Sequence, residues 1–268
     1  MGKRIVSVAI LLPIAIALII IGGWPFYIGI TAMIGLGAKE FSRLFQQSHQ
    51  YNPSNLLIIS GAVLFVLSRV LWGFANSEAL LTLLTLAAMT IHIIHRERGN
   101  ENSVIDFCIT IAGLFYVGWL GAYIISLRDL PDGAWWLILS LGAVWFADSG
   151  AYFIGTRYGK HPMAPAVSPK KSWEGYLGGI ITSIIFTPLL AIVLREFTPA
   201  ITIAHALIMG IIVSILAPLG DLGISMIKRY FNVKDSGKLI PGHGGALDRL
   251  DSILWAAAIS YHLINWFF

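Results

Sequence analysis

The feature that most constrains this chain is a series of apolar runs, each close to the length that a bilayer requires. Nine runs can be marked, namely Ile5–Gly22, Trp24–Leu36, Leu56–Trp72, Ala79–Ile94, Val104–Leu127, Ala134–Ile154, Trp173–Leu194, Ile201–Ile227 and Ser252–Phe268. A helical span needs about 17–25 apolar residues, so only the second run is short and only the eighth is long. Charged residues make up 12% of the chain, about half the share found in soluble domains. The sequence therefore predicts an all-α polytopic integral membrane protein with about nine transmembrane helices.

The positive charges indicate how these helices are oriented. If the N terminus is cytoplasmic, all but three of the 18 lysines and arginines fall on the cytoplasmic side, and the exceptions are Arg69, Arg128 and Arg195. Such a bias is the usual signal of orientation, and it predicts a C terminus on the outer side. It also accounts for the net charge of +4, so we expect no nucleic-acid partner. The first run is long and lacks a small-residue cleavage pattern, which favours a retained signal anchor in the plasma (bacterial inner) membrane.

The polar stretch between the last two runs, Ser225–Asp251, concentrates the chemistry of the chain. It contains cations, carboxylates and one histidine, namely Lys228, Arg229, Lys234, Lys238, Arg249, Asp235, Asp248, Asp251 and His243. Proline and paired glycines exclude a helix over Pro241–Gly245 and predict a loop whose backbone amides can approach a ligand. Asp248 and Asp251 then share one face of the last helix. Carboxylates among cations suit a divalent metal that bridges a polyphosphate.

Two further acids are predicted to lie at the cytoplasmic ends of membrane helices. Asp148 falls about one and a half turns inside the sixth run, where an ionised carboxylate costs about 2.5 kcal/mol or more unless it is paired, hydrated or bound to metal. The alternative role for Asp148 is to pair with a loop cation. Asp221 follows Pro218 and Gly220, which predict a break in the eighth helix near the inner leaflet. Carboxylates from three separate spans that approach one membrane face favour a metal site.

The loop before the seventh run carries a weaker signal. Ser172 is predicted to cap the helix that follows, with Glu174 in its first turn. Lys170 and Lys171 stand next to that helix start and predict a corner that attracts phosphate. By contrast, Asp106 is explained equally well as a carboxylate at a helix N terminus.

A family resemblance follows from these motifs. The series Ser225-x-x-Lys228-Arg229, Lys234-Asp235-x-Gly237, Ile240-Pro241-Gly242-His243-Gly244-Gly245 and Asp248-Arg249-x-Asp251 resembles the signature of the phosphatidate cytidylyltransferases, or CDP-diacylglycerol synthases. Ala246 is smaller than the aliphatic residue expected there. The segments Asp148-Ser-Gly-Ala-Tyr and Ser168-Pro-Lys-Lys-Ser-Trp-Glu-Gly are also similar to family features. We expect one transmembrane domain over 1–268, with N-terminal helices of unknown role in 1–133 and a motif-bearing catalytic half in 134–268.

The resemblance implies that the chain converts CTP and phosphatidic acid to CDP-diacylglycerol and pyrophosphate at the cytoplasmic face, with Mg²⁺ and a second cation as an option. It implies a metal held by Asp221 and Asp248, with Asp148 as a further ligand and Asp251 in support. The implied substrate-binding residues are Ser168, Lys170, Lys171, Lys228, Arg229, Lys234, Asp235, Gly242, His243, Gly244, Gly245 and Arg249. A homodimer is also typical of the family.

Two other functions explain part of the pattern. A polyprenyl-phosphate phosphosugar transferase also needs carboxylates, metal and a lipid phosphate, but it does not account for the Pro-Gly-His-Gly-Gly loop. An ion-coupled transporter would use a broken helix and its acid, yet it favours matching interrupted helices in two related halves. The sequence has no such repeat, so cytidylyl transfer is the preferred interpretation.

Overall fold

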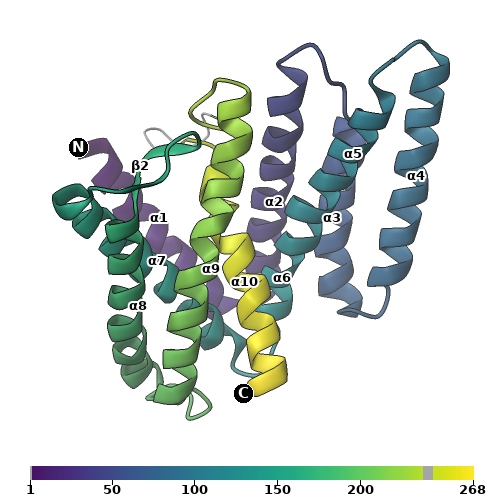
Figure 1. Cartoon of the computed structure of the whole chain (residues 1–268). Coiled ribbons are helices and arrows are strands. Elements are labelled where there is room, and N and C mark those ends of the chain that lie inside the picture. The colour runs from purple at the N-terminus through teal and green to yellow at the C-terminus, as the bar shows by residue number, and fades with distance from the viewer. Residues whose placement is uncertain (1, 238–243) are drawn as a thin grey trace. The chain divides into compact units, whose positions relative to one another are not determined.

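The computed structural model describes residues 2–237 and 244–268, with side chains from residue 12 onward. The order of elements is α1 (Gly2–Ile21), α2 (Gly23–Gln46), α3 (Asn55–Trp72), α4 (Ser77–Glu97), α5 (Ser103–Gly113), the π-helical η1 (Leu114–Trp119), α6 (Leu120–Arg128), α7 (Gly133–Tyr158), β1 (Pro162–Ala164), β2 (Ser168–Ser172), α8 (Trp173–Leu194), α9 (Ile203–Tyr230) and α10 (Leu247–Phe267) (Figure 1). Apart from one short hairpin, the regular elements of the described residues are helices, which confirms the all-α prediction.

Six helical segments in the described part of the chain are long and apolar enough to cross a membrane. They are α3, α4, the continuous segment Ser103–Arg128, α7, α8 and α9. The other long helices α2 and α10 contain charged residues. The structure therefore supports an integral membrane protein, while the count of nine spans stays a prediction.

Several helix boundaries lie where the local sequence predicts them. The seventh run and α8 share the bounds Trp173–Leu194, and Ser172 caps that helix by accepting a hydrogen bond from Gly175 N at 3.2 Å. The second run covers only part of its helix, because α2 continues to Gln46, ten residues past the end of the apolar run at Leu36. Phe41 and Leu44 are buried, so packing extends the helix through residues too polar to be marked as a membrane run.

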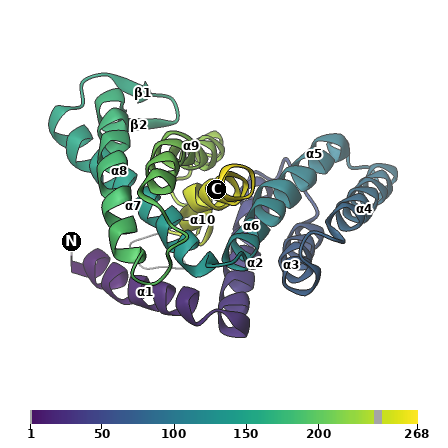
Figure 2. The ribbon, with the colours of Figure 1, turned by 90° about the horizontal axis from the view of Figure 1, so that it is seen from below.

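The chain forms two compact units, of which the first comprises Met1–Ser126 and Tyr230–Leu250. Within it α2 packs on α3, α3 packs on η1, and α4 packs on α5 (Figure 2). The largest buried side chains include Phe26, Phe41 and Phe65. Between helices that span a membrane, such side chains stabilise the assembly by van der Waals packing rather than by removal from water.

Asp106 has a structural role in the first unit. Its carboxylate accepts hydrogen bonds from Asn52 N and from Asn100 Nδ2, both at 2.8 Å. It thereby connects the segment before α3 with the segment before α5. Because these contacts account for a fully buried carboxylate, Asp106 is not needed in the candidate site.

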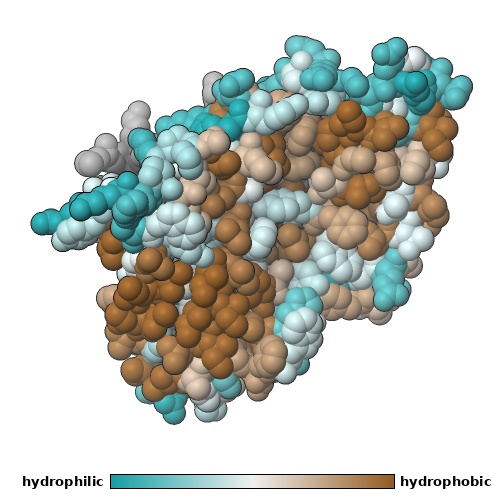
Figure 3. All heavy atoms as spheres, in the orientation of Figure 1, coloured by the Kyte–Doolittle hydropathy of each residue, from teal (hydrophilic) through white to brown (hydrophobic). Residues whose placement is uncertain are grey.

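The second unit comprises Leu127–Arg229 and Asp251–Phe268. Helices α7 and α8 pack along each other, and Ser183 Oγ donates a hydrogen bond to the carbonyl of Ala143 at 3.1 Å. Strands β1 and β2 pair antiparallel between these helices in sequence. Apolar atoms cover the visible faces of α8 and α9, whereas polar atoms gather over the hairpin (Figure 3). This division matches helices that face lipid and a hairpin that faces water.

The predicted break of the eighth span at Pro218 is wrong. Helix α9 runs without interruption from Ile203 to Tyr230, with Pro218 inside it. A proline removes one N–H donor and leaves the other helical hydrogen bonds in place, so a long helix with packed sides can retain its course. The backbone of α10 also passes close by, since a Cβ on Gly220 would lie 2.3 Å from the carbonyl oxygen of Asp251. The absence of a side chain at Gly220 therefore permits close helix packing rather than a break.

Candidate active site

Asp248 stands in the first turn of α10, where a dense set of donors surrounds its carboxylate. Its Oδ2 accepts hydrogen bonds from Ser236 N at 2.8 Å, Ser236 Oγ at 3.0 Å and Gly245 N at 2.9 Å. Hydrogen bonds to an ionised acceptor are among the stronger ones in proteins. Ser236 lies before residues 238–243, which the structure does not describe, and Gly245 lies after them. Together these two residues hold the carboxylate of Asp248 in one orientation.

Glu40 of α2 is a residue that sequence reasoning missed. Its Oε1 accepts from Ala246 N at 3.1 Å, and its Oε2 accepts from Leu247 N at 2.9 Å and Ser236 Oγ at 2.8 Å. The only available sequence signal was an acid between Lys39 and Arg43, which are themselves read as orientation charges. Because the partners lie about two hundred positions away along the chain, no local pattern could indicate this contact.

Asp221 belongs to the second unit and has a different environment. Lys171 Nζ forms an ion pair with Asp221 Oδ2 at 2.8 Å and also donates to the carbonyl of Pro218 at 3.4 Å. Ser225 Oγ, one turn further along α9, donates to Asp221 Oδ1 at 3.2 Å. Lys228 follows on the same helix face and attracts the carboxylate electrostatically. The acid at this position is therefore partly neutralised by cations that the sequence assigned to phosphate binding.

The hairpin that carries Lys171 is fixed at both of its ends. Pro162 pairs with Ser172, and Ala164 pairs with Ser168. Glu174 accepts hydrogen bonds from Lys160 N, at 3.0 Å, and from His161 N. Arg229 Nε of α9 donates to the carbonyl of Val167 at 3.3 Å, so the tip of the hairpin is connected to the helix that bears Asp221.

The two supporting acids differ in exposure. Asp148 has an exposed side chain on α7. Asp251 is buried on α10, and its Oδ1 accepts a hydrogen bond from Ser252 N at 2.7 Å. Within the second unit, Asp251 lies beside α9 at Gly220, next to Asp221 in the chain.

The remaining predicted residues are mostly exposed. Lys170, Lys234, Asp235 and Arg249 have exposed side chains, whereas Lys228 is only 7% exposed. Gly244 has a φ of 80°, a left-handed conformation that favours glycine. Lys238, Gly242 and His243 lie outside the described residues. The amide of Gly245, expected to face a triphosphate, donates to Asp248 instead.

The described residues include no group of three or more His, Cys, Asp or Glu side chains that could hold a metal ion. Mg²⁺ keeps several waters and is usually bound through one or two carboxylates plus substrate phosphates. Asp221 and Asp248 both offer the hard oxygen atoms that Mg²⁺ prefers. Their chemistry therefore fits the predicted metal.

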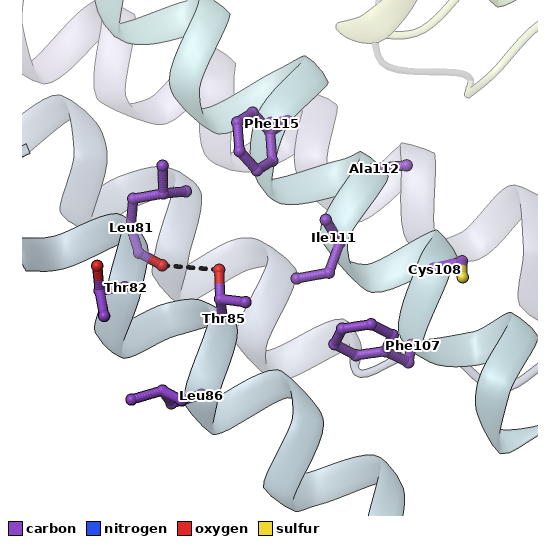
Figure 4. Close-up of a pocket in the computed structure, with 9 residues that line it drawn as sticks. All are labelled: Leu81, Thr82, Thr85, Leu86, Phe107, Cys108, Ile111, Ala112 and Phe115. Carbon is purple, nitrogen blue, oxygen red and sulfur yellow. Dashed lines mark hydrogen bonds between the residues drawn. The ribbon is translucent and has the colours of Figure 1, made fainter. Parts of the chain in front are cut away.

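A groove in the first unit has a different character. It has a volume of about 800 Å³, is lined from α4, α5 and η1, and includes Leu81, Leu86, Phe107, Ile111 and Phe115 (Figure 4). Thr85 also lines it, but its hydroxyl donates to the carbonyl of Leu81 within α4 at 2.8 Å. No charged side chain lines the groove, so it lacks the groups that would bind a nucleotide or a metal.

Comparison with known proteins identifies the family. A model described as the cytidylyltransferase family matches residues 2–267. A protein named phosphatidate cytidylyltransferase from Bacillus subtilis is 31% identical over 100% of this chain and 98% of its own length. The protein of the same name from Synechocystis is 31% identical over 98% of this chain and 96% of its own, and that from Haemophilus influenzae is 45% identical over 53% and 49%. Since the family model covers almost the whole sequence, the chain belongs to the cytidylyltransferase family.

Proposed function

We propose that this protein is a membrane nucleotidyltransferase that converts CTP and phosphatidate to CDP-diacylglycerol and pyrophosphate. The observation that carries this conclusion is the full-length similarity to proteins named phosphatidate cytidylyltransferase. The membrane helices suit a lipid substrate that enters from the bilayer. The product is a precursor for phospholipid synthesis, since it carries an activated phosphate on a diacylglycerol.

The reaction proceeds by in-line attack at phosphorus. A phosphate oxygen of phosphatidate attacks the α-phosphorus of CTP, the new O–P bond forms, and the bond to the β-phosphate oxygen breaks so that pyrophosphate leaves. Phosphatidate is already anionic, so the nucleophile needs no general base. Positioning and neutralisation of charge therefore supply most of the catalysis.

Asp221 and Asp248 are the residues that would hold Mg²⁺, with Asp148 as a further ligand, Asp251 in support and a second cation as an option. The bound metal supplies positive charge to the phosphate oxygens during transfer. Two features of this chain support the assignment. Asp248 is oriented by backbone donors, and Lys171 orients Asp221 through their ion pair.

The cations of the motifs bind the phosphates of the two substrates. These residues are Lys170, Lys171, Lys228, Arg229, Lys234 and Arg249, and the neighbouring loop residues Ser168, Asp235 and Gly242–Gly245 complete the set. Support comes from their spacing in the signature and from the exposure of Lys170, Lys234 and Arg249. Each exposed ammonium or guanidinium group is available to a nucleotide that arrives from water.

The site faces the cytoplasm in this proposal, with nine spans, a cytoplasmic N terminus and a C terminus on the outer side of the bacterial inner membrane. Support comes from the distribution of lysine and arginine. CTP is a cytosolic metabolite, so an inner-leaflet site gives access to both substrates. A homodimer is the assembly expected from the family resemblance.

The test is a transfer assay on the purified full-length protein in detergent. Labelled CTP, phosphatidic acid and Mg²⁺ are supplied, and labelled CDP-lipid is measured for wild type, Asp221→Asn and Asp248→Asn. We expect the wild type to form CDP-lipid and both variants to lose about 100-fold or more in rate, because each loses a charge that supports transition-state stabilisation.

Asp132→Asn is the matched control, since Asp132 is exposed in the turn before α7 and its left-handed φ of 56° suits asparagine. The control is expected to behave like wild type. A folded wild type that forms no CDP-lipid with Mg²⁺ present would contradict the proposed function, and the phosphosugar-transferase reaction would then be assayed. Full activity in both site variants would contradict only the metal assignment.

A further inference from the structure

Glu40 lies in the part of α2 that extends past the apolar run, and its carboxylate is directed at the start of α10. The contacts are with Ser236, Ala246 and Leu247, at 2.8–3.1 Å. We propose that Glu40 is a positioning residue for the transfer reaction, and that it acts by holding the loop and helix start that orient Asp248. This inference rests on the proposed role of Asp248 in metal binding.

The two carboxylates divide the local donors between them. Asp248 accepts hydrogen bonds from the amides of Ser236 and Gly245, and Glu40 accepts them from the amides of Ala246 and Leu247. The hydroxyl of Ser236 lies within hydrogen-bond distance of both acids, at 2.8 Å from Glu40 Oε2 and 3.0 Å from Asp248 Oδ2. Each acid is thus fixed through the same short segments that fix the other.

The contacts at α10 amount to a helix cap supplied from a distant helix. The first amides of an α-helix lack partners within the helix, and a nearby residue in the chain usually satisfies one of them. Here the Glu40 carboxylate, which belongs to α2, accepts the hydrogen bonds of the Ala246 and Leu247 amides. The positive end of the helix dipole also favours the negative charge of both Glu40 and Asp248, which offsets the repulsion between them.

Two glycines make room for the Glu40 carboxylate. A Cβ on Gly237 would lie 2.2 Å from Glu40 Oε1, and a Cβ on Gly245 would lie 2.2 Å from Oε2. These distances are far below van der Waals contact, so the acid occupies space that only glycine leaves open. Gly237 and Gly245 therefore leave open the space that the Glu40 carboxylate occupies.

The hydrogen bonds distinguish positioning from direct catalysis. Glu40 Oε1 and Oε2 both receive backbone amides, and Oε2 also receives a hydroxyl group. A carboxylate that already accepts these hydrogen bonds orients the groups that donate them, in the way that outer-shell partners orient metal ligands. Loss of such a partner typically reduces metal affinity or activity about 10- to 100-fold.

The variants are Glu40→Gln and Glu40→Ala, with Glu97→Gln as the control because Glu97 is exposed at the end of α4. Glutamine keeps the shape and one acceptor oxygen, although its NH₂ group cannot accept from an N–H group, so its effect is expected to be smaller than that of alanine. We expect Glu40→Ala to reduce kcat about 10- to 100-fold and to raise the Mg²⁺ concentration for half-maximal rate by a similar factor. The control should match wild type in both measurements.

A second readout is independent of activity. In hydrogen exchange on the full-length protein without substrates, the amides of Ala246 and Leu247 should exchange about fivefold faster in Glu40→Ala, as expected for the loss of a helix cap. Unchanged exchange of these two amides would overturn the proposal. So would a Glu40→Ala variant whose transfer rate is reduced but whose dependence on Mg²⁺ concentration matches that of wild type. A wild type that forms no CDP-lipid would instead contradict the proposed function, and the exchange measurement would still test the Glu40 contacts.

Discussion

Asp248 and Asp221 illustrate two ways of holding an ionised side chain. Asp248 accepts hydrogen bonds from two backbone amides and one hydroxyl group, so its orientation depends on the course of the chain. Asp221 is held by the ammonium group of Lys171 and the hydroxyl of Ser225. A lysine side chain has several rotatable bonds, so the partner of Asp221 can move while the partners of Asp248 remain fixed.

Replacement of Lys171 and replacement of its neighbour Lys170 should therefore have different effects on the reaction rate. Lys171→Met keeps an unbranched side chain but removes the charge that pairs with Asp221, and we expect its kcat to fall about 100-fold. Lys170→Met removes a charge from an exposed side chain, and we expect a smaller loss that appears mainly in KM for CTP. The measurement is initial rate as a function of CTP and phosphatidate concentration.

Equal losses in the two variants would contradict a special role for the Lys171–Asp221 pair. Lys171→Arg provides a further comparison, because it retains the charge but changes the geometry of the donor. Partial recovery of kcat by arginine would show that charge, rather than side-chain length alone, supports Asp221.

At the scale of the element, α9 combines a membrane span with one polar face. Asp221, Ser225 and Lys228 follow each other at helical spacing near its end, where Lys228 is buried. Pro218 stands directly before this face, and its carbonyl accepts a hydrogen bond from Lys171. Helix α9 thus carries these site residues on one uninterrupted helix that includes Pro218.

Replacement of Pro218 tests whether α9 must bend at this position during the reaction. Pro218→Ala restores the missing N–H donor, so we expect activity comparable to wild type and an unfolding free energy higher by up to about 3 kcal/mol, the usual cost of proline inside a helix. Pro188→Ala is the matched control, because Pro188 is the internal proline of α8. Thermal unfolding and the CDP-lipid assay are measured on both variants. Loss of activity in Pro218→Ala alone would indicate that α9 must bend at this position during the reaction.

At the scale of the whole molecule, the arrangement of charge determines which membrane face each polar segment is expected to occupy. Lysine and arginine gather in alternate segments between the helices, and such segments remain on the cytoplasmic side. The segment between α4 and α5 is then expected to be cytoplasmic, and the segment between α6 and α7 is expected on the outer side. This orientation would place every motif residue on one face.

Cysteine labelling of cells and vesicles checks the orientation. In a Cys108→Ser background, which removes the single cysteine of the chain, Glu101→Cys and Pro131→Cys each introduce one exposed site. We expect a membrane-impermeant maleimide to label Pro131→Cys in spheroplasts and Glu101→Cys only in inverted vesicles. The reverse pattern would show that the predicted orientation is inverted. Labelling of both variants in detergent serves as the control for access.

The sequence by itself determined the features that depend on composition and on neighbours along the chain. Apolar runs predicted α3, α4, α7, α8 and α9 because burial in lipid requires long apolar helices. The cap at Ser172 followed from local hydrogen-bond chemistry, and the helix start before Asp248 followed from the proline and glycines that precede it. The motif residues indicated the reaction through their resemblance to the phosphatidate cytidylyltransferase signature, and their carboxylates and cations are groups that suit phosphoryl transfer.

Only the tertiary structure decided which side chains become partners. The contacts of Glu40 with residues near 236 and 246, and of Lys171 with Asp221, join segments that no local pattern connects. Helix α9 kept its course through Pro218 because the loss of one donor is small beside the bonds and packing that remain. Local sequence specifies what an element can be, whereas the partner of a carboxylate depends on how distant elements pack.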